Sequence, residues 1–164
     1  MTPDLNLHLS EHFQLKEFVR SKLAEVHRID NTPPAEAVVN MRGLCVNTLE
    51  PIRFFIGRPI VVSSGFRCPK LNVKAGGSPT SDHMFGRAVD IEVPGMDNLA
   101  LAHLIADGGF VFDQLILEFY KVGTPASGWC HVSWRKDPRF QVRTARKNPN
   151  TGKIDEVPGL PPIP

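Results

Sequence analysis

Apolar residues recur at helical spacing through the first third of the chain. The apolar residues within 10–27 predict one or two helical turns that pack against a core. A longer run begins at Ala35, where Asn31 or Thr32 can cap its start, and continues for about five turns until Gly57. It predicts the longest helix of the chain. The apolar positions of this helix are Val38, Met41, Leu44, Cys45, Leu49, Ile52 and Phe55.

Four later segments carry the alternation or the short apolar runs that are typical of β-strands. Between the second and third of them, Asp97 or Asn98 can cap a helix that runs through Ile105 to a Gly108-Gly109 stop. Helices thus come first, and strands follow in a mostly hairpin-like series. This order predicts an α+β fold in which N-terminal helices pack on a small, mainly antiparallel sheet. The expected strands cover residues 59–63, 88–93, 114–120 and 129–134, and residues 64–80 are expected to form a loop.

The length of 164 residues suits one compact domain, and we expect it to cover residues 1–143. Residues 144–164 show no periodicity, are basic at first and are rich in proline at the end. They predict an extended C-terminal tail that lies on the surface or is disordered.

Composition and charge narrow the class of protein. A net charge of +2 is too small to imply a nucleic-acid partner, and 41% hydrophobic residues are ordinary for a globular domain. The three cysteines are odd in number and lack CxxC spacing, so reduced thiols are expected. The first residues show no secretory signal, and no apolar run approaches the ~18 residues of a membrane span. The expectation is a monomer that is made and kept in a cytoplasm.

Two histidines and an aspartate stand at spacings that can hold one zinc ion. His83 precedes the second strand, Gly86 lets the backbone fold back, and Asp90 follows on that strand. His131 lies on the last strand, where alternation places it on one face with Trp129. Three nitrogen or oxygen ligands leave the fourth position of a tetrahedral zinc open, as a hydrolytic site requires.

Three further residues are candidates for the chemistry around this metal. Glu118 ends the apolar run 115–117, where a carboxylate costs free energy, and it is either a general base or a strand-edge surface residue. Arg67 lies in a turn after a buried strand, where it either grips a carboxylate or oxyanion or is a solvated loop residue. Ser81 can hydrogen-bond a substrate or cap the local turn.

Together these residues resemble the zinc D-Ala-D-Ala carboxypeptidases of the Hedgehog/D,D-peptidase fold, in particular small cell-wall peptidases of phages and prophages. The resemblance covers residues 11–143 and is most specific in the complete Ser-x-His-x-x-Gly-x-Ala-x-Asp pattern of residues 81–90. The other matching motifs are Ser64-Gly65-Phe66-Arg67, Gly76-Gly77-Ser78, Asp113-Gln114-Leu115-Ile116-x-Glu118 and Trp129-x-His131-Val132-Ser133.

The resemblance implies roles for individual residues. It implies that His83, Asp90 and His131 bind Zn2+. It also implies that Glu118 is the catalytic base and that Arg67 is a catalytic residue that contacts the substrate.

Ser81, Gln114 and Trp129 are further expected substrate contacts. The chain departs from the family pattern at two positions. Some members carry a second histidine where this chain has Trp129, and others place the acidic base where it has Gly128. Because of both departures, Glu118 is expected to carry out the acid–base chemistry by itself. Trp129 is instead a candidate for an apolar wall that contacts the substrate.

The leading interpretation is a zinc metallopeptidase that hydrolyses peptidoglycan stem peptides. If Arg67 reads a free C-terminal carboxylate, the enzyme removes terminal D-Ala as a carboxypeptidase. If the site is open at both ends, it cuts within the stem as an endolysin-like endopeptidase. The alternative is a non-catalytic, zinc-containing module on the same fold that binds cell wall or a protein. Because no secretory signal is visible, the resemblance implies action on the wall after release or as a virion component.

A basic segment lies between Arg135 and Lys153, where seven cations face a single acid, Asp137. Such a segment can act as a nucleic-acid arm, as a solvated tail or as a contact with an anionic cell envelope. The solvated tail is favoured over the nucleic-acid arm, and an envelope contact would use the same charges.

Overall fold

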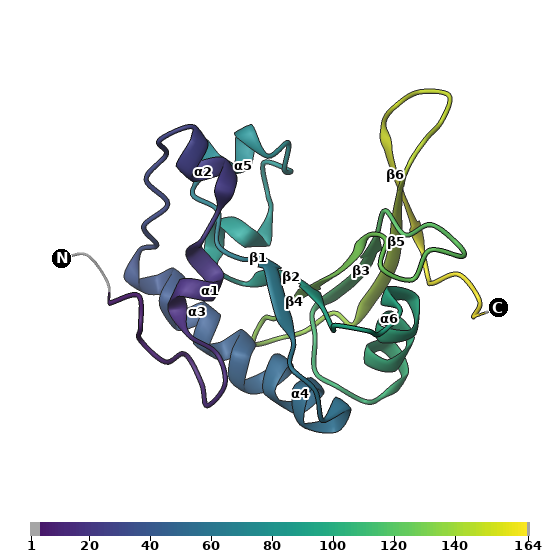
Figure 1. Cartoon of the computed structure of the whole chain (residues 1–164), viewed down its shortest axis with the longest axis horizontal. Helices are drawn as coiled ribbons and strands as arrows, with labels where there is room; N and C mark the ends of the chain where they lie inside the picture. The colour runs from purple at the N-terminus through teal and green to yellow at the C-terminus, as the bar shows by residue number, and fades with distance from the viewer. Residues whose placement is uncertain (1–3, 164) are drawn as a thin grey trace.

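The computed structural model describes residues 4–163 and contains one six-stranded sheet with helices packed around it (Figure 1). The strand order is β1-β2-β4-β3-β5-β6. Neighbouring strands are antiparallel except β3 and β5, which are parallel. The predicted α+β fold with a mainly antiparallel sheet is confirmed. The strands are β1 (Val61–Ser64), β2 (Ala88–Glu92), β3 (Gln114–Glu118), β4 (Trp129–Ser133), β5 (Gln141–Lys147) and β6 (Ile154–Pro158).

The long helix predicted from Ala35 is present and ends at Gly57, whose φ of 66° is left-handed. It consists of three segments without interruption, because a π-helical turn, Cys45–Leu49, joins α3 to α4. The loop predicted over residues 64–80 is partly wrong. It contains a short helix that starts at a proline, a residue whose fixed φ suits the first helical turn. The helices are α1 (Leu15–Val19), α2 (Lys22–Val26), α3 (Ala35–Leu44), α4 (Glu50–Ile56), α5 (Pro69–Lys74) and α6 (Asn98–Asp107).

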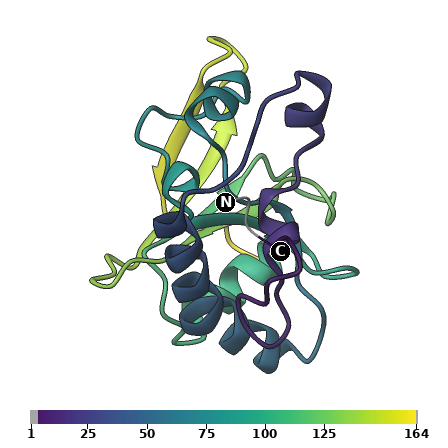
Figure 2. The ribbon, with the colours of Figure 1, turned by 90° about the vertical axis from the view of Figure 1, so that its left-hand side faces the viewer.

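The two faces of the sheet differ in chemistry. In Figures 1 and 2, α3, α4 and α6 lie on one side of the sheet, and the side chains between them form the apolar core. Alternation along the strands turns the other set of side chains away from these helices. That second set carries two of the three predicted metal ligands, Asp90 and His131. The strand residues of the core face include Val62, Val89, Ile91, Leu115, Leu117, Cys130 and Val132, all essentially without solvent exposure.

The last part of the chain differs from the predicted tail. The boundary expected at residue 143 falls inside β5, and residues 144–158 are largely strand. β5 pairs with β3, β6 pairs with β5, and the hairpin extends beyond the other strands (Figure 1). Only Ala145 is buried within it, so the period-two hydrophobic signal of a strand is absent from its sequence.

No helix in the described part of the chain combines the length and the apolar character needed to cross a bilayer.

Candidate metal centre

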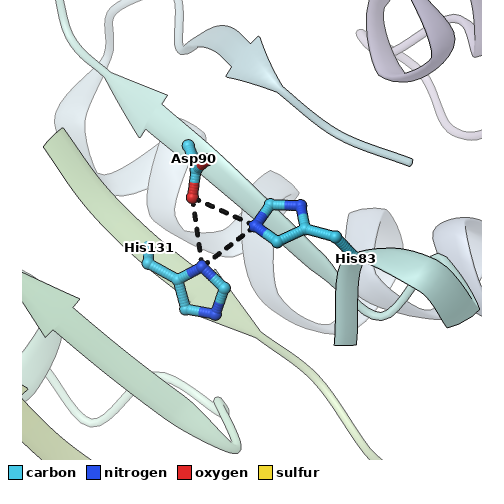
Figure 3. A group of neighbouring side chains, drawn as sticks. All are labelled: His83, Asp90 and His131. Carbon is cyan, nitrogen blue, oxygen red and sulfur yellow. Dashed lines mark hydrogen bonds and ion pairs between the residues drawn. The ribbon is translucent and has the colours of Figure 1, made fainter. Parts of the chain in front are cut away.

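Three side chains that are far apart in the sequence converge on one point above the sheet. Figure 3 shows His83, Asp90 and His131 pointing toward one another. His83 Nε2 lies 3.2 Å from both Asp90 Oδ1 and His131 Nδ1, and His131 Nδ1 lies 3.0 Å from Asp90 Oδ1. All three residues are buried. The ligand set implied by the resemblance is therefore a single cluster in space.

Strand register places two of the three ligands. Asp90 on β2 is the direct cross-strand partner of His131 on β4, so both side chains leave the sheet on the same face. His83 lies in a 3₁₀ turn, Asp82–Phe85, that ends at Gly86 with a left-handed φ of 68°. A Cβ on Gly86 would also collide with the backbone carbonyl of Ala37, so glycine is needed there to fold His83 back over the strand.

The donor atoms fit a zinc ion. Tetrahedral ligands at ~2.0–2.1 Å from zinc stand about 3.3–3.4 Å apart, close to the distances in this cluster. His83 Nδ1 donates to the carbonyl of Gly65 at 2.6 Å, so Nε2 is the unprotonated nitrogen. The lone pair of His83 Nε2 faces a carboxylate oxygen of Asp90. Both atoms are acceptors, so a cation bound between them stabilises the arrangement.

The protonation states suit metal binding. Burial lowers the pKa of His83 and outweighs the opposing charge of Asp90, so the ring is neutral. Burial acts to raise the pKa of Asp90, but His83 and His131 hold it far below its usual range. Burial likewise opposes the charged form of His131, yet the Asp90 carboxylate raises the pKa of His131 overall. A metal that binds here replaces the proton that His131 shares with Asp90.

Glu118 lies beside the cluster on the same face of the sheet. On β3 it is two residues from Ile116, the cross-strand partner of His131, and its own partner is Trp129. Burial raises the pKa of Glu118 to about 7, while the charge of His131 lowers it and that of Asp90 raises it. A carboxyl group with this pKa exchanges a proton near neutral pH, as a general base requires.

Arg67 reaches the cluster from its other side. Its Nη2 lies 3.0 Å from Asp90 Oδ2, and its Nε donates to Ser64 Oγ at 3.2 Å. β1 contains an irregularity between Val62 and Ser64 that sets Ser64 opposite Asp90. Such bulges re-aim side chains, and here the bulge brings the turn that carries Arg67 against a metal-ligand carboxylate.

Comparison with known families agrees with this geometry. A family model for peptidase M15 matches residues 11–121, more than half of the chain. The chain belongs to the peptidase M15 family. M15 peptidases are zinc-dependent, and the cluster provides the donor types that zinc needs. A search of curated proteins found no match to this chain. His131 lies beyond the matched residues, so the pairing of β2 with β4 is what brings it into the M15 site.

One support for the M15 site was not apparent from the sequence. Asn31, expected as a helix cap, instead donates through its amide to the carbonyls of Val19 and Phe66 and accepts from Cys68 N–H, each at 2.8–2.9 Å. It therefore clamps the turn that holds Arg67. Its position before two prolines favoured the cap interpretation, because the partner segments are distant in sequence.

A second support is an ionic network behind His83. Arg135 contacts both oxygens of Asp82 at 2.9–3.1 Å and pairs with Asp113 at 3.2 Å. Arg139 also binds Asp113, which is fully buried. The network ties the turn before His83 to the β4–β5 connection. Two cations of the predicted basic segment, Arg135 and Arg139, thus belong to this network.

The other predicted substrate contacts lie around this M15 site in different ways. Trp129 and Gln114 stand on the metal face, but Gln114 donates to Gln141 and Trp129 packs against Phe119, with ring centroids 5.2 Å apart. Ser81 flanks the 3₁₀ turn, and its backbone carbonyl accepts from Met84. The structure brings Glu118 and Arg67 to the cluster and leaves these three at its margins.

Proposed function

We propose that this M15 peptidase is a zinc metallopeptidase that hydrolyses the stem peptides of peptidoglycan. The observation that supports the proposal most strongly is the buried triad of His83, Asp90 and His131, flanked on one side by Glu118 and on the other by Arg67. Zinc held by the triad would supply a Lewis acid to the scissile carbonyl.

Glu118 is the proposed general base. It takes a proton from the attacking water as the water oxygen bonds to the peptide carbon, and it returns the proton to the amine nitrogen as the C–N bond breaks. Burial raises the pKa of Glu118 to about 7 in the metal-free protein, which favours its return to the protonated form during the reaction. The products are a carboxylate and an amine.

Arg67 is the proposed substrate anchor. A guanidinium has five N–H donors, and Asp90 and Ser64 occupy two of those of Arg67. The other three are available for a substrate carboxylate or for the developing oxyanion. Ser81, Gln114 and Trp129 are proposed contacts for more distant parts of the peptide.

The stem-peptide substrate and the phage-type setting follow from the resemblance of residues 11–143 to small cell-wall peptidases. In this proposal the protein acts as a monomer and reaches the wall after release or as a virion component. Attraction to an anionic envelope is proposed for those residues of the basic segment 135–153 that have no carboxylate partner within residues 4–163. These are Lys136, Arg146, Lys147 and Lys153.

Mass spectrometry of muropeptides incubated with the zinc-loaded protein tests the proposal. Loss of terminal alanine would identify a carboxypeptidase, and a cut within the stem would identify an endopeptidase. Glu118→Gln should abolish either product while zinc stays bound, and Glu11→Gln is the matched control because the Glu11 side chain is 84% exposed. Turnover by Glu118→Gln would refute the role of the base.

Absence of product from every muropeptide would favour the alternative function, a zinc-containing binding module on the same fold. A second measurement separates the two functions. Chelation lowers the melting temperature in either case, because zinc binds the folded protein, but it stops hydrolysis only if the protein is a zinc peptidase.

A further inference from the structure

A cavity of about 360 Å³ lies beside Arg67, between the start of α2 and the end of β1. Residues 20–22, Glu25 and residues 63–67 line it. Its wall is continuous with the metal cluster, because the Gly65 carbonyl accepts from His83 and Arg67 contacts Asp90. The cavity therefore adjoins the metal cluster, and Arg67 belongs to both.

The two segments that form the cavity are fastened to each other. Phe66 N–H donates to the carbonyl of Phe18 at 2.6 Å. Arg20 Nη2 lies 3.4 Å from the carbonyl of Val62, across the same junction. The Asn31 side chain bridges the carbonyls of Val19 and Phe66. The cavity is consequently preformed, which reduces the ordering cost of binding a ligand.

The side chains that line the cavity carry more positive than negative charge. Lys22 is paired with Glu25 at 3.1 Å, and Arg67 is paired with Asp90. Arg20 has no carboxylate within 4.0 Å among residues 4–163. An arginine fork at the edge of a preformed cavity is suited to a bidentate contact with a carboxylate.

We propose that this cavity is a subsite for a carboxylate-bearing residue of the peptide substrate, with Arg20 as the residue that determines specificity. The inference rests on the proposed peptidase function and adds to it the charge of the substrate. The volume exceeds what a carboxylate alone needs and accommodates an amino-acid side chain together with its acid group. The carboxylate can be the C-terminus of the peptide or an acidic group within it.

The test compares three synthetic stem peptides that differ only in their carboxylates. One has all carboxylates free, one has a C-terminal amide, and one has the internal carboxylate converted to a carboxamide. Binding is measured by calorimetry on zinc-loaded Glu118→Gln protein, so that no peptide is consumed. Arg20→Gln in this background should weaken binding of the free peptide about tenfold, the typical effect of one charged hydrogen bond.

The amidated peptides identify the source of the carboxylate. The peptide whose affinity no longer responds to Arg20→Gln lacks the group that Arg20 binds. Arg20→Lys should retain part of the affinity because it keeps the charge and loses the fork. Arg53→Gln on α4 is the matched control, since Arg53 is outside the cavity lining, and it should leave all three affinities unchanged.

Two results would overturn the inference. Equal affinities of the Arg20→Gln and Arg53→Gln proteins for the free peptide would show that Arg20 makes no contact with it. An equal loss for all three peptides would show that the substitution disturbs the fold instead of removing a charge contact. If wild-type protein hydrolyses the free peptide while either result holds, the peptidase function stands and the subsite alone is wrong. If wild type neither binds nor cleaves any of the peptides, both proposals fall.

Discussion

Replacement of Glu118 by glutamine is expected to abolish hydrolysis by the zinc-loaded protein. In the metal-free protein the same replacement is expected to raise the free energy of unfolding above that of wild type at alkaline pH. Burial raises the pKa of Glu118 from the ordinary 4.5 to about 7, against the attraction of His131 and with the repulsion of Asp90. The folded state therefore disfavours the ionised carboxylate. The interval between 4.5 and about 7 corresponds to about 3 kcal/mol of free energy of unfolding at ~1.4 kcal/mol per pH unit.

The direction of the pH dependence follows from proton linkage. Between pH 4.5 and about 7 the folded protein retains a proton on Glu118 that the unfolded chain has released. The free energy of unfolding of wild type falls across this window and levels off above it. Glutamine cannot ionise, so the free energy of unfolding of the variant does not fall across this window. The stability gained by Glu118→Gln should be about 2–2.5 kcal/mol larger at pH 8 than at pH 5, after allowance for partial solvent access.

Urea unfolding of chelator-treated wild type, Glu118→Gln and Glu11→Gln at the two pH values measures this difference. The free energy of unfolding of the exposed Glu11→Gln control should stay within about 0.5 kcal/mol of the wild-type value at both pH values. A gain from Glu118→Gln that is the same at pH 5 and pH 8, or smaller at pH 8, would show that the Glu118 carboxylate is well solvated and would remove the basis for its raised pKa.

Four other outcomes are expected. Asn31→Ala should lower the free energy of unfolding by about 2–4 kcal/mol in urea titrations, because it removes the three hydrogen bonds that tie Val19 to the turn around Arg67. Asp113→Asn should cost about 2–3 kcal/mol in the same assay, because the two arginines that it binds lose their buried charge partner. Gly86→Ala should cost at least about 1–2 kcal/mol for its left-handed backbone, and the collision with Ala37 should weaken zinc affinity in a competition titration. Chelation should lower the melting temperature and stop peptide hydrolysis, and added zinc should restore both.

Much of the candidate site was predictable because its signals are local. The pattern of residues 81–90 holds two ligand types and the glycine that turns the backbone between them. Alternation along 129–133 correctly separated the face of His131 from the core face of Cys130, which is fully buried. Glu118 was recognisable as a carboxylate at the end of an apolar strand. These inferences need only the period of a strand and the chemistry of each side chain.

The hairpin of β5 and β6 shows where local signals fail. Apart from Ala145 its residues are exposed or half-buried, so the pairing of β5 with β3 and of β6 with β5 leaves no hydrophobic period to detect. The ion pair of Arg143 with Glu156, like that of Arg139 with Asp113, gives charges of the predicted basic segment partners within the fold. A count of charges in the sequence cannot foresee partners that only folding supplies.

By itself, the sequence determined the ligand types, the long helix that ends at Gly57 and the face of each strand on which a side chain lies, because these depend on neighbours a few residues away. Tertiary structure alone decided that Asp90 stands opposite His131, that Arg67 contacts Asp90 and that Glu118 has a pKa of about 7. Register and burial are set by hydrogen bonds and packing between segments tens of residues apart, and no local pattern encodes them.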